Sequence, residues 1–180
     1  MDILFACTMD QLIAISQPII GLLQLVAIIF IGIWTIKTYH RITEISKNAT
    51  IEAARLNDKS NRFNKLNSDL DKIVEYSIQY PYFEDEEYPT KNYRSDLNSG
   101  DLIRREKALR YELFAIMNFN FIEDLYKYYN GNEEQMSDQT NFTEMIESHA
   151  EYWKYKIIEK NENGYKIIKP LVNRTLNIQQ

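Results

Sequence analysis

The sequence has little of the chemistry that most catalytic and metal-binding sites require. It contains one cysteine, Cys7, and two histidines, His40 and His149, in 180 residues. A single cysteine excludes an internal disulfide and a cysteine-based zinc site. A di-metal carboxylate bundle needs Glu-x-x-His twice, and neither histidine has Glu three residues before it. The P-loop, the GxSxG motif and the dinucleotide fingerprint are also missing from the sequence, so it predicts no catalytic residue, no cofactor and no metal centre.

An excess of positive charge is also missing. Lys and Arg number 21 against 26 Asp and Glu, which gives a net charge of -5. Nucleic-acid binding depends on clustered Lys and Arg that neutralise phosphates and release counterions. We therefore expect no nucleic-acid partner.

Charge is absent altogether from residues 19–36, IIGLLQLVAIIFIGIWTI, and the uncharged run reaches back to Gln11. A hydrocarbon core of about 30 Å needs roughly 20 helical residues at about 1.5 Å each. A buried helix of a soluble domain is the alternative, but such helices are usually shorter. The sequence therefore predicts a transmembrane helix at residues 17–36, with the lipid bilayer as a partner.

The flanks of this segment predict an uncleaved anchor and its orientation. No basic residue precedes the apolar run and no small-residue cleavage site follows it, so a signal peptide is disfavoured, and Cys7 has too few residues before it for a lipoprotein signal. The charged residues in 1–16 are Asp2 and Asp10, and both are acidic. Basic residues follow the span closely at Lys37, Arg41, Lys47, Arg55, Lys59 and Arg62. Because positive residues stay inside, we expect a translocated N-terminus (1–16), a cytoplasmic region (37–180) and a bacterial inner membrane as the location.

Four residues help to place the expected span. Pro18 suits the first helical turn, and Trp34 and Tyr39 suit the cytoplasmic interface as aromatic anchors. Gln24 could hydrogen-bond across a helix pair or lie near the outer interface, and we favour the interface. There is no GxxxG pattern to indicate tight dimerisation of the span.

A seven-residue rhythm predicts one long helix from Ile42 to Tyr80. Its two seam positions hold Ile42, Ala49, Leu56, Phe63, Leu70 and Ser77, and Ile45, Glu52, Lys59, Leu66, Ile73 and Tyr80. Charge at Glu52 and Lys59 weakens a coiled-coil seam. We therefore expect residues 37–80 to form a solvated juxtamembrane stalk whose packing strengthens from Phe63 onward and which ends before Pro81.

Residues 81–100 are expected to form a loop, since they combine two prolines, the acidic run Glu84-Asp85-Glu86-Glu87 and a closing Asn98-Ser99-Gly100. The acidic run could contact a cation or a partner, or it could be a solvated connector. Its spacing matches no calcium loop of the DxDxDG kind. We favour the connector.

Residues 101–180 predict a small helical bundle that packs on the end of the stalk, so the fold class is all-α. One helix runs from an Asp101 cap to a Gly131 stop, and another begins at an Asn141 cap and continues to about Asn163. The expected core stripe of the first is Leu102, Leu109, Leu113, Ile116, Phe119, Ile122, Leu125 and Tyr129. Residues 165–178, interrupted by Pro170, are either a short helix or an extended tail.

Four side chains in this bundle are candidate interaction or structural polar positions. Asn118 and Asn120 lie in an apolar stretch and must be hydrogen-bonded if buried. We favour structural amides over ligand contacts. His149 shares a helix face with Trp153, and a histidine there is more often a packed residue with one hydrogen bond than a catalyst. An enzyme acting through His149 and nearby carboxylates is the less favoured alternative.

Four short motifs, each present once, follow one another along the chain. They are Phe63-Asn64-Lys65-Leu66-Asn67, Tyr80-Pro81-Tyr82-Phe83, Phe119-Asn120-Phe121-Ile122-Glu123 and His149-Ala150-Glu151-Tyr152-Trp153. This layout resembles that of uncharacterised bacterial single-pass membrane proteins of the DUF4760 type, over most of residues 17–160. The resemblance implies a single-pass helical protein and brings no catalytic residue with it.

The sequence as a whole is typical of a membrane-anchored cytoplasmic interaction or scaffold module without catalytic activity. Its partner would be another protein or a second copy of the chain. The alternative is a membrane-perturbing effector or small channel component, in which Gln24 and the N-terminal segment assemble in the bilayer.

Overall fold

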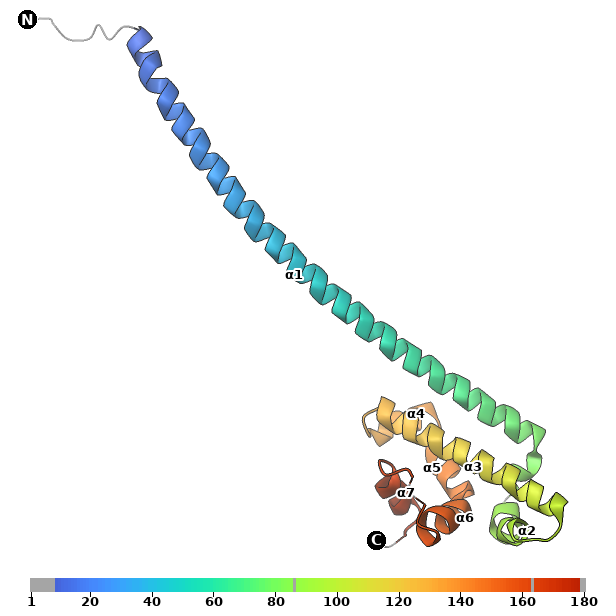
Figure 1. Cartoon of the computed structure of the whole chain (residues 1–180). Coiled ribbons are helices and arrows are strands. Elements are labelled where there is room, and N and C mark those ends of the chain that lie inside the picture. Colours follow the sequence, from blue (N-terminus) through green and yellow to red (C-terminus); the bar gives the residue numbers. More distant parts are fainter. Residues whose placement is uncertain (1–8, 86, 163, 179–180) are drawn as a thin grey trace, which may run out of the picture. The chain divides into compact units, whose positions relative to one another are not determined.

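The computed structural model describes residues 9–85, 87–162 and 164–178, with side chains from residue 16 onward. These residues form seven α-helices and no strand, so the all-α prediction is confirmed (Figure 1). The chain divides into two units between Asn57 and Asp58. Most of the expected translocated N-terminus, with Asp2 and Cys7, lies outside the described residues, as does Glu86 of the acidic run.

Helix α1, Met9–Gln79, joins the predicted span and the predicted stalk in one continuous helix. Its termination before Pro81 agrees with the sequence prediction. Pro18 lies inside α1 and not in its first turn, so that expectation is wrong. Residues 9–17 contain no helix breaker, and the helix therefore continues upstream of the proline.

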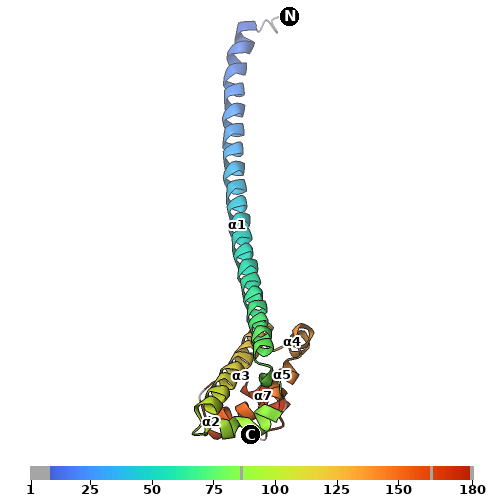
Figure 2. The same ribbon diagram turned by 90° about the vertical axis from the view of Figure 1, so that its right-hand side faces the viewer.

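The end of α1 packs on α3, Leu102–Tyr128, in antiparallel fashion (Figures 1 and 2). The Phe63 ring lies 5.9 Å from that of Tyr128. Further along α1, Leu66 and Ile73 are buried. The side chains of α1 from residue 16 to residue 57 are exposed, apart from the half-buried Thr38. Packing therefore begins near Phe63, as the seam predicted.

The prediction of a loop at residues 81–100 is wrong, because most of this segment is helical. It contains a 3₁₀ turn at Pro81–Phe83, a π-helical segment at Tyr88–Asn92 and helix α2 at Tyr93–Leu97. The Phe83 ring stacks on Phe114 of α3 with centroids 4.6 Å apart. Burial of Phe83, Tyr88 and Tyr93 against α3 stabilises local structure that the proline and acidic content disfavours.

Helix α3 begins and ends as predicted, but three of the eight residues in its expected core stripe are exposed. The Asp101 side chain accepts a hydrogen bond from the Ile103 amide at 2.9 Å. Leu102, Leu109 and Leu113 are 79%, 45% and 62% exposed. The buried residues of this helix are Ala108, Tyr111, Phe114, Ala115, Asn118, Phe119, Phe121, Ile122 and Leu125. The aromatic residues of 81–97 cover the side of α3 that carries Tyr111. Leu102, Leu109 and Leu113 lie on the opposite side of the helix.

The long helix expected from Asn141 to Asn163 is also wrong, because the chain breaks at His149, where φ is -112° and ψ is 22°. The segments are α5 (Phe142–Ser148), α6 (Ala150–Tyr152) and a π-helical stretch (Trp153–Glu159). The Asn141 cap is confirmed by its bond to the Glu144 amide. The short helix α4, Glu133–Gln139, was not predicted. Helix α7, Lys169–Thr175, answers the open question at residues 165–178 in favour of a short helix.

Candidate functional site

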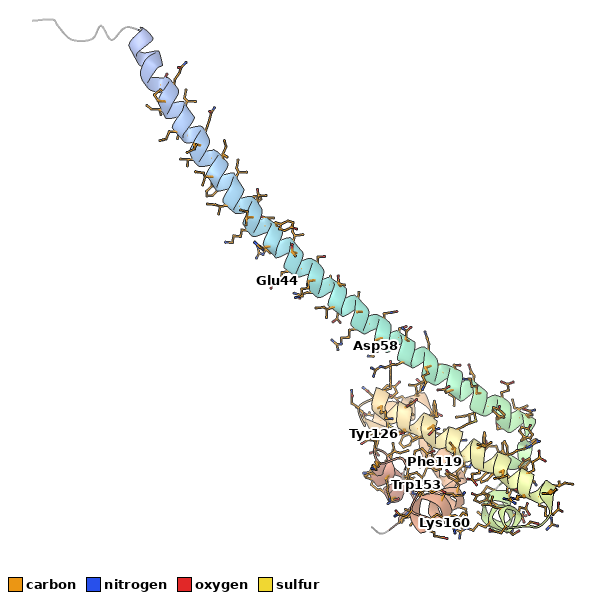
Figure 3. All side chains as sticks on the ribbon, in the orientation of Figure 1. Glu44, Asp58, Phe119, Tyr126, Trp153 and Lys160 are labelled. Atoms are coloured by element: carbon orange, nitrogen blue, oxygen red, sulfur yellow. The ribbon has the colours of Figure 1, made fainter. Side chains whose placement is uncertain are left out.

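The apolar part of α1 has no protein around it in its own unit. Exposed fractions there include 69% at Ile28 and 71% at Phe30. Its most apolar 18-residue window has a mean hydropathy of 2.5 and contains no buried residue. By length and composition, α1 is therefore a helix that could cross a membrane. The predicted placement residues Pro18, Gln24, Trp34 and Tyr39 are all exposed on it. Figure 3 shows the side chains of this part of α1 projecting outward from the ribbon.

The second part of α1 in this unit carries most of its exposed large apolar residues on one side, while Ile51, which is 58% exposed, lies opposite them. Ile42, Ile45 and Leu56 are 60%, 62% and 58% exposed. Hydroxyl groups nearby bond to the helix's own backbone, as Thr43 does to the Tyr39 carbonyl at 2.9 Å. Thr43 therefore presents its methyl group, and not an unsatisfied hydroxyl, at the helix surface.

His149 lies in the core of the second unit. Its Nδ1 is 3.0 Å from the Tyr111 hydroxyl, and the two residues are 1% and 0% exposed. Burial lowers the pKa of His149 to about 4 and raises that of Tyr111. At neutral pH the imidazole is therefore neutral, and one hydrogen bond joins its Nδ1 to the Tyr111 hydroxyl. The Phe114 ring meets the imidazole edge-on at 5.4 Å.

A cavity of about 260 Å³ adjoins His149, and a second of about 310 Å³ lies next to it. The residues that line both are Glu84, Glu144 and Ser148. Burial and the negative charge of Glu144 raise the pKa of Glu84. Among the residues with described side chains, no group of three or more His, Cys, Asp or Glu is arranged to hold a metal ion. The carboxylates near His149 therefore border a polar cavity without forming a metal-ligand set.

The other predicted polar positions separate into buried and exposed ones. The Asn118 side chain is 2% exposed and donates to the Phe114 carbonyl at 2.9 Å, an arrangement that holds the amide within its own helix. Asn120 is exposed and lines a separate cavity of about 310 Å³ between α1 and α3. It does not belong to the buried polar group that includes Asn118 and His149.

Trp153 is fully buried beside Phe119, with ring centroids 4.8 Å apart (Figure 3). Its indole N–H donates to Oδ1 of Asn173 at 3.0 Å. Asn173 on α7 was missed by sequence reasoning. A buried tryptophan needs an acceptor for its N–H, but the sequence does not indicate which of the many amides supplies it.

The leucine face of α3, defined as Leu102, Leu109 and Leu113, was predicted to be core and is exposed instead. It adjoins an apolar groove of about 330 Å³ between the end of α1 and α3. The groove is lined by Tyr76, Tyr80, Phe83, Arg110, Leu113, Phe114, Ile116 and Met117. An apolar surface of this kind is typical of a contact site.

Comparison with protein-family models, with curated proteins and with solved structures found no match for this chain. The resemblance to single-pass proteins of the DUF4760 type therefore stays a prediction. The function proposed below rests on the geometry of the two units described above.

Proposed function

We propose that this protein is a membrane-anchored interaction module without catalytic activity. Residues 17–36 span the bilayer, the N-terminus is translocated, and residues 37–180 lie in the cytoplasm. The observation that carries the proposal is the segment 19–36 of α1, which is free of charge and exposed on every side. Eighteen helical residues measure about 27 Å, close to the thickness of a hydrocarbon core.

Lipid removes the apolar side chains of this segment from water. Burial of a Leu, Ile or Phe side chain is worth about 1.5–3 kcal/mol, and this segment contains many such side chains without any cover from its own unit. Lipid provides that cover and requires nothing of the backbone, since a helix satisfies its own hydrogen bonds. Basic residues that follow Ile36 support the orientation.

The second unit supports a role in binding rather than in catalysis. Its buried histidine is neutral and hydrogen-bonded to a tyrosine, an arrangement suited to packing. Its surface carries the leucine face of α3 and the adjoining groove. A small bundle that leaves leucines exposed in this way is suited to a protein partner.

Two measurements test the proposal together. Full-length protein is expected to stay in the membrane pellet after carbonate washing. A labelling enzyme fused to the C-terminus is expected to mark a reproducible set of cytoplasmic neighbours, or the chain itself. A version with Leu109→Glu and Leu113→Glu is the matched control for partners held by the leucine face.

Protein found in the soluble fraction, or a monomer that labels no reproducible neighbour, would remove the proposal. Leakage of dye from vesicles that contain the purified protein would instead support the membrane-perturbing alternative. Labelling that is strong but directed to the translocated side would contradict the orientation alone.

A further inference from the structure

We infer that α1 pairs in parallel with α1 of a second copy of this chain, along one charge-free face. This face is defined by Ile42, Ile45, Ala49, Ala53 and Leu56. The inference rests on the proposed function, and it names the partner of that membrane-anchored module.

Helical geometry places these five residues together. At about 100° per residue, they fall within a sector of about 80° around the helix axis, with spacings of three or four residues. All five are exposed in the chain. The three large ones are each about three-fifths exposed, so their own unit does not cover them.

The charged residues of this segment all point elsewhere. They are Lys37, Arg41, Glu44, Lys47, Glu52, Arg55, Asp58 and Lys59. On the same helical projection they occupy a sector of about 140°. This sector begins opposite the face and ends at Glu52, which borders the face. Two of them, Glu52 and Arg55, pair with each other at 3.5 Å. The segment therefore has a charged side and an uncharged side.

This division of charge fits a parallel pair of identical helices. In such a pair each residue at the contact lies opposite its own copy, so any charge on the face would meet a like charge. The two flanks also differ. Arg41, Glu52 and Lys59 border one edge, whereas Ser46 and Asn57 border the other. A parallel pair brings the charged edge of one helix against the neutral edge of the other.

Small residues at Ala49 and Ala53, four positions apart, let the two backbones approach closely. A three-four-four spacing also keeps the face nearly straight along the helix, because eleven residues complete about three turns. Glu52 and Lys59, which disrupt a strict seven-residue seam, lie outside a face with this spacing. The weakness of the heptad seam is therefore compatible with pairing.

Gln24 lies on the same side of α1 as Ile42, because 18 residues correspond to about five full turns. Pairing gives Gln24 a hydrogen bond across a helix pair, and not the interface position that the sequence alone favours, because the Gln24 side chain of a second copy at the same depth provides both a donor and an acceptor. Helical geometry thus places the one strongly polar side chain of residues 19–36 in line with the face. A single anchor in each copy also fixes the parallel direction.

Cysteine cross-linking in vesicles tests the pairing directly. Cys7→Ser removes the native thiol, and single cysteines are then placed on the face, with Ala49→Cys, and on the charged side, with Lys47→Cys as the matched control. The full-length protein is reconstituted at low density in neutral-lipid vesicles and mildly oxidised. We expect at least fivefold more disulfide-linked dimer for Ala49→Cys than for Lys47→Cys.

A charge placed on the face gives an independent readout. Ala49→Glu is expected to weaken dimerisation at least tenfold, as counted by single-molecule photobleaching, while Asn48→Glu on the charged side changes it less than twofold. Both residues are exposed on α1, so both variants should keep their helical circular dichroism.

The outcomes separate the two proposals. Membrane-bound protein that is monomeric, or that cross-links equally from both positions, would overturn the pairing and leave the membrane anchor in place. Protein that does not enter vesicles at all would overturn both.

Discussion

The Tyr111 hydroxyl lies 3.0 Å from Nδ1 of His149, with both side chains buried between α3 and the start of α6. This bond ties α3 to the residue that separates α5 from α6. It joins the aromatic cluster of Phe83 and Phe114 to the C-terminal segments. A neutral histidine is therefore part of the core.

The burial of His149 predicts a loss of stability in acid. Its pKa is about 4 in the folded protein against about 6.5 in an unfolded chain, so the unfolded state binds the proton more readily. The free energy of unfolding is fully retained above about pH 6.5 and falls as the pH drops from there to about 4, by roughly 3 kcal/mol in total. Urea unfolding of the full-length protein in detergent, followed between pH 7 and pH 4.5, measures this slope.

His149→Gln is the matched variant for that measurement, because its amide can still accept a hydrogen bond from Tyr111. We expect a lower stability at pH 7 but a flatter pH dependence. Glu84 has the opposite effect on stability. Its pKa is raised in the folded protein, so its protonation increases the free energy of unfolding as the pH falls. Glu84→Gln in both proteins removes this contribution, and equal slopes in the two proteins would refute the role assigned to His149.

The bond between Trp153 and Asn173 predicts a second stability effect. Asn173→Ala leaves a buried indole N–H without its acceptor, which costs about 1–3 kcal/mol. The exposed Asn120→Ala serves as the control and is expected to change the free energy of unfolding by less than about 0.5 kcal/mol. In a Trp153→Phe background the Asn173→Ala cost should shrink, and a full cost there would show that the hydrogen bond is not its cause.

Much of this fold was predictable from local signals. The Asp101 and Asn141 caps, the end of α1 before Pro81 and the stop near Gly131 each depend on a few neighbouring residues. The phase of α3 depends on more distant ones. Either the leucines or the aromatic residues of that helix could have faced the core. The aromatic residues of 81–97 pack on the second set, so the leucines are exposed.

The same limit applies to the candidate site residues. The sequence could indicate that His149 and Trp153 would be buried, but their partners Tyr111 and Asn173 lie 38 and 20 residues away. The break at His149 is a tertiary effect as well, since residues 142–159 carry no proline or glycine to mark it. The exposed span of α1, by contrast, is a property of composition, and the sequence alone predicts it.

Gly131 supplies a third prediction. Its φ is +76°, and a Cβ added there would lie 2.9 Å from the Tyr126 ring. Gly131→Ala should therefore cost about 1–2 kcal/mol, from the left-handed backbone and from displacement of Tyr126. Gly100→Ala meets nothing within 4 Å and is the control. Thermal unfolding that is the same for both variants would contradict the predicted strain.

A charge in the centre of the proposed span should impair insertion. Ile28→Arg places a guanidinium near the middle of residues 19–36, at a cost of about 2.5–3.5 kcal/mol on insertion scales. Ile51→Arg makes the same change at an exposed residue outside the span. We expect less membrane-integrated protein for the first variant only, as measured by the inserted fraction in a coupled translation and membrane assay. Equal insertion of both would argue against residues 19–36 as the spanning segment.

Fractionation of untagged full-length protein, after washing with high salt and then carbonate, tests whether α1 spans the bilayer. A bilayer-spanning α1 predicts that the protein stays in the membrane pellet and leaves it only with detergent. Recovery in the supernatant, without lipid or detergent, would contradict the account.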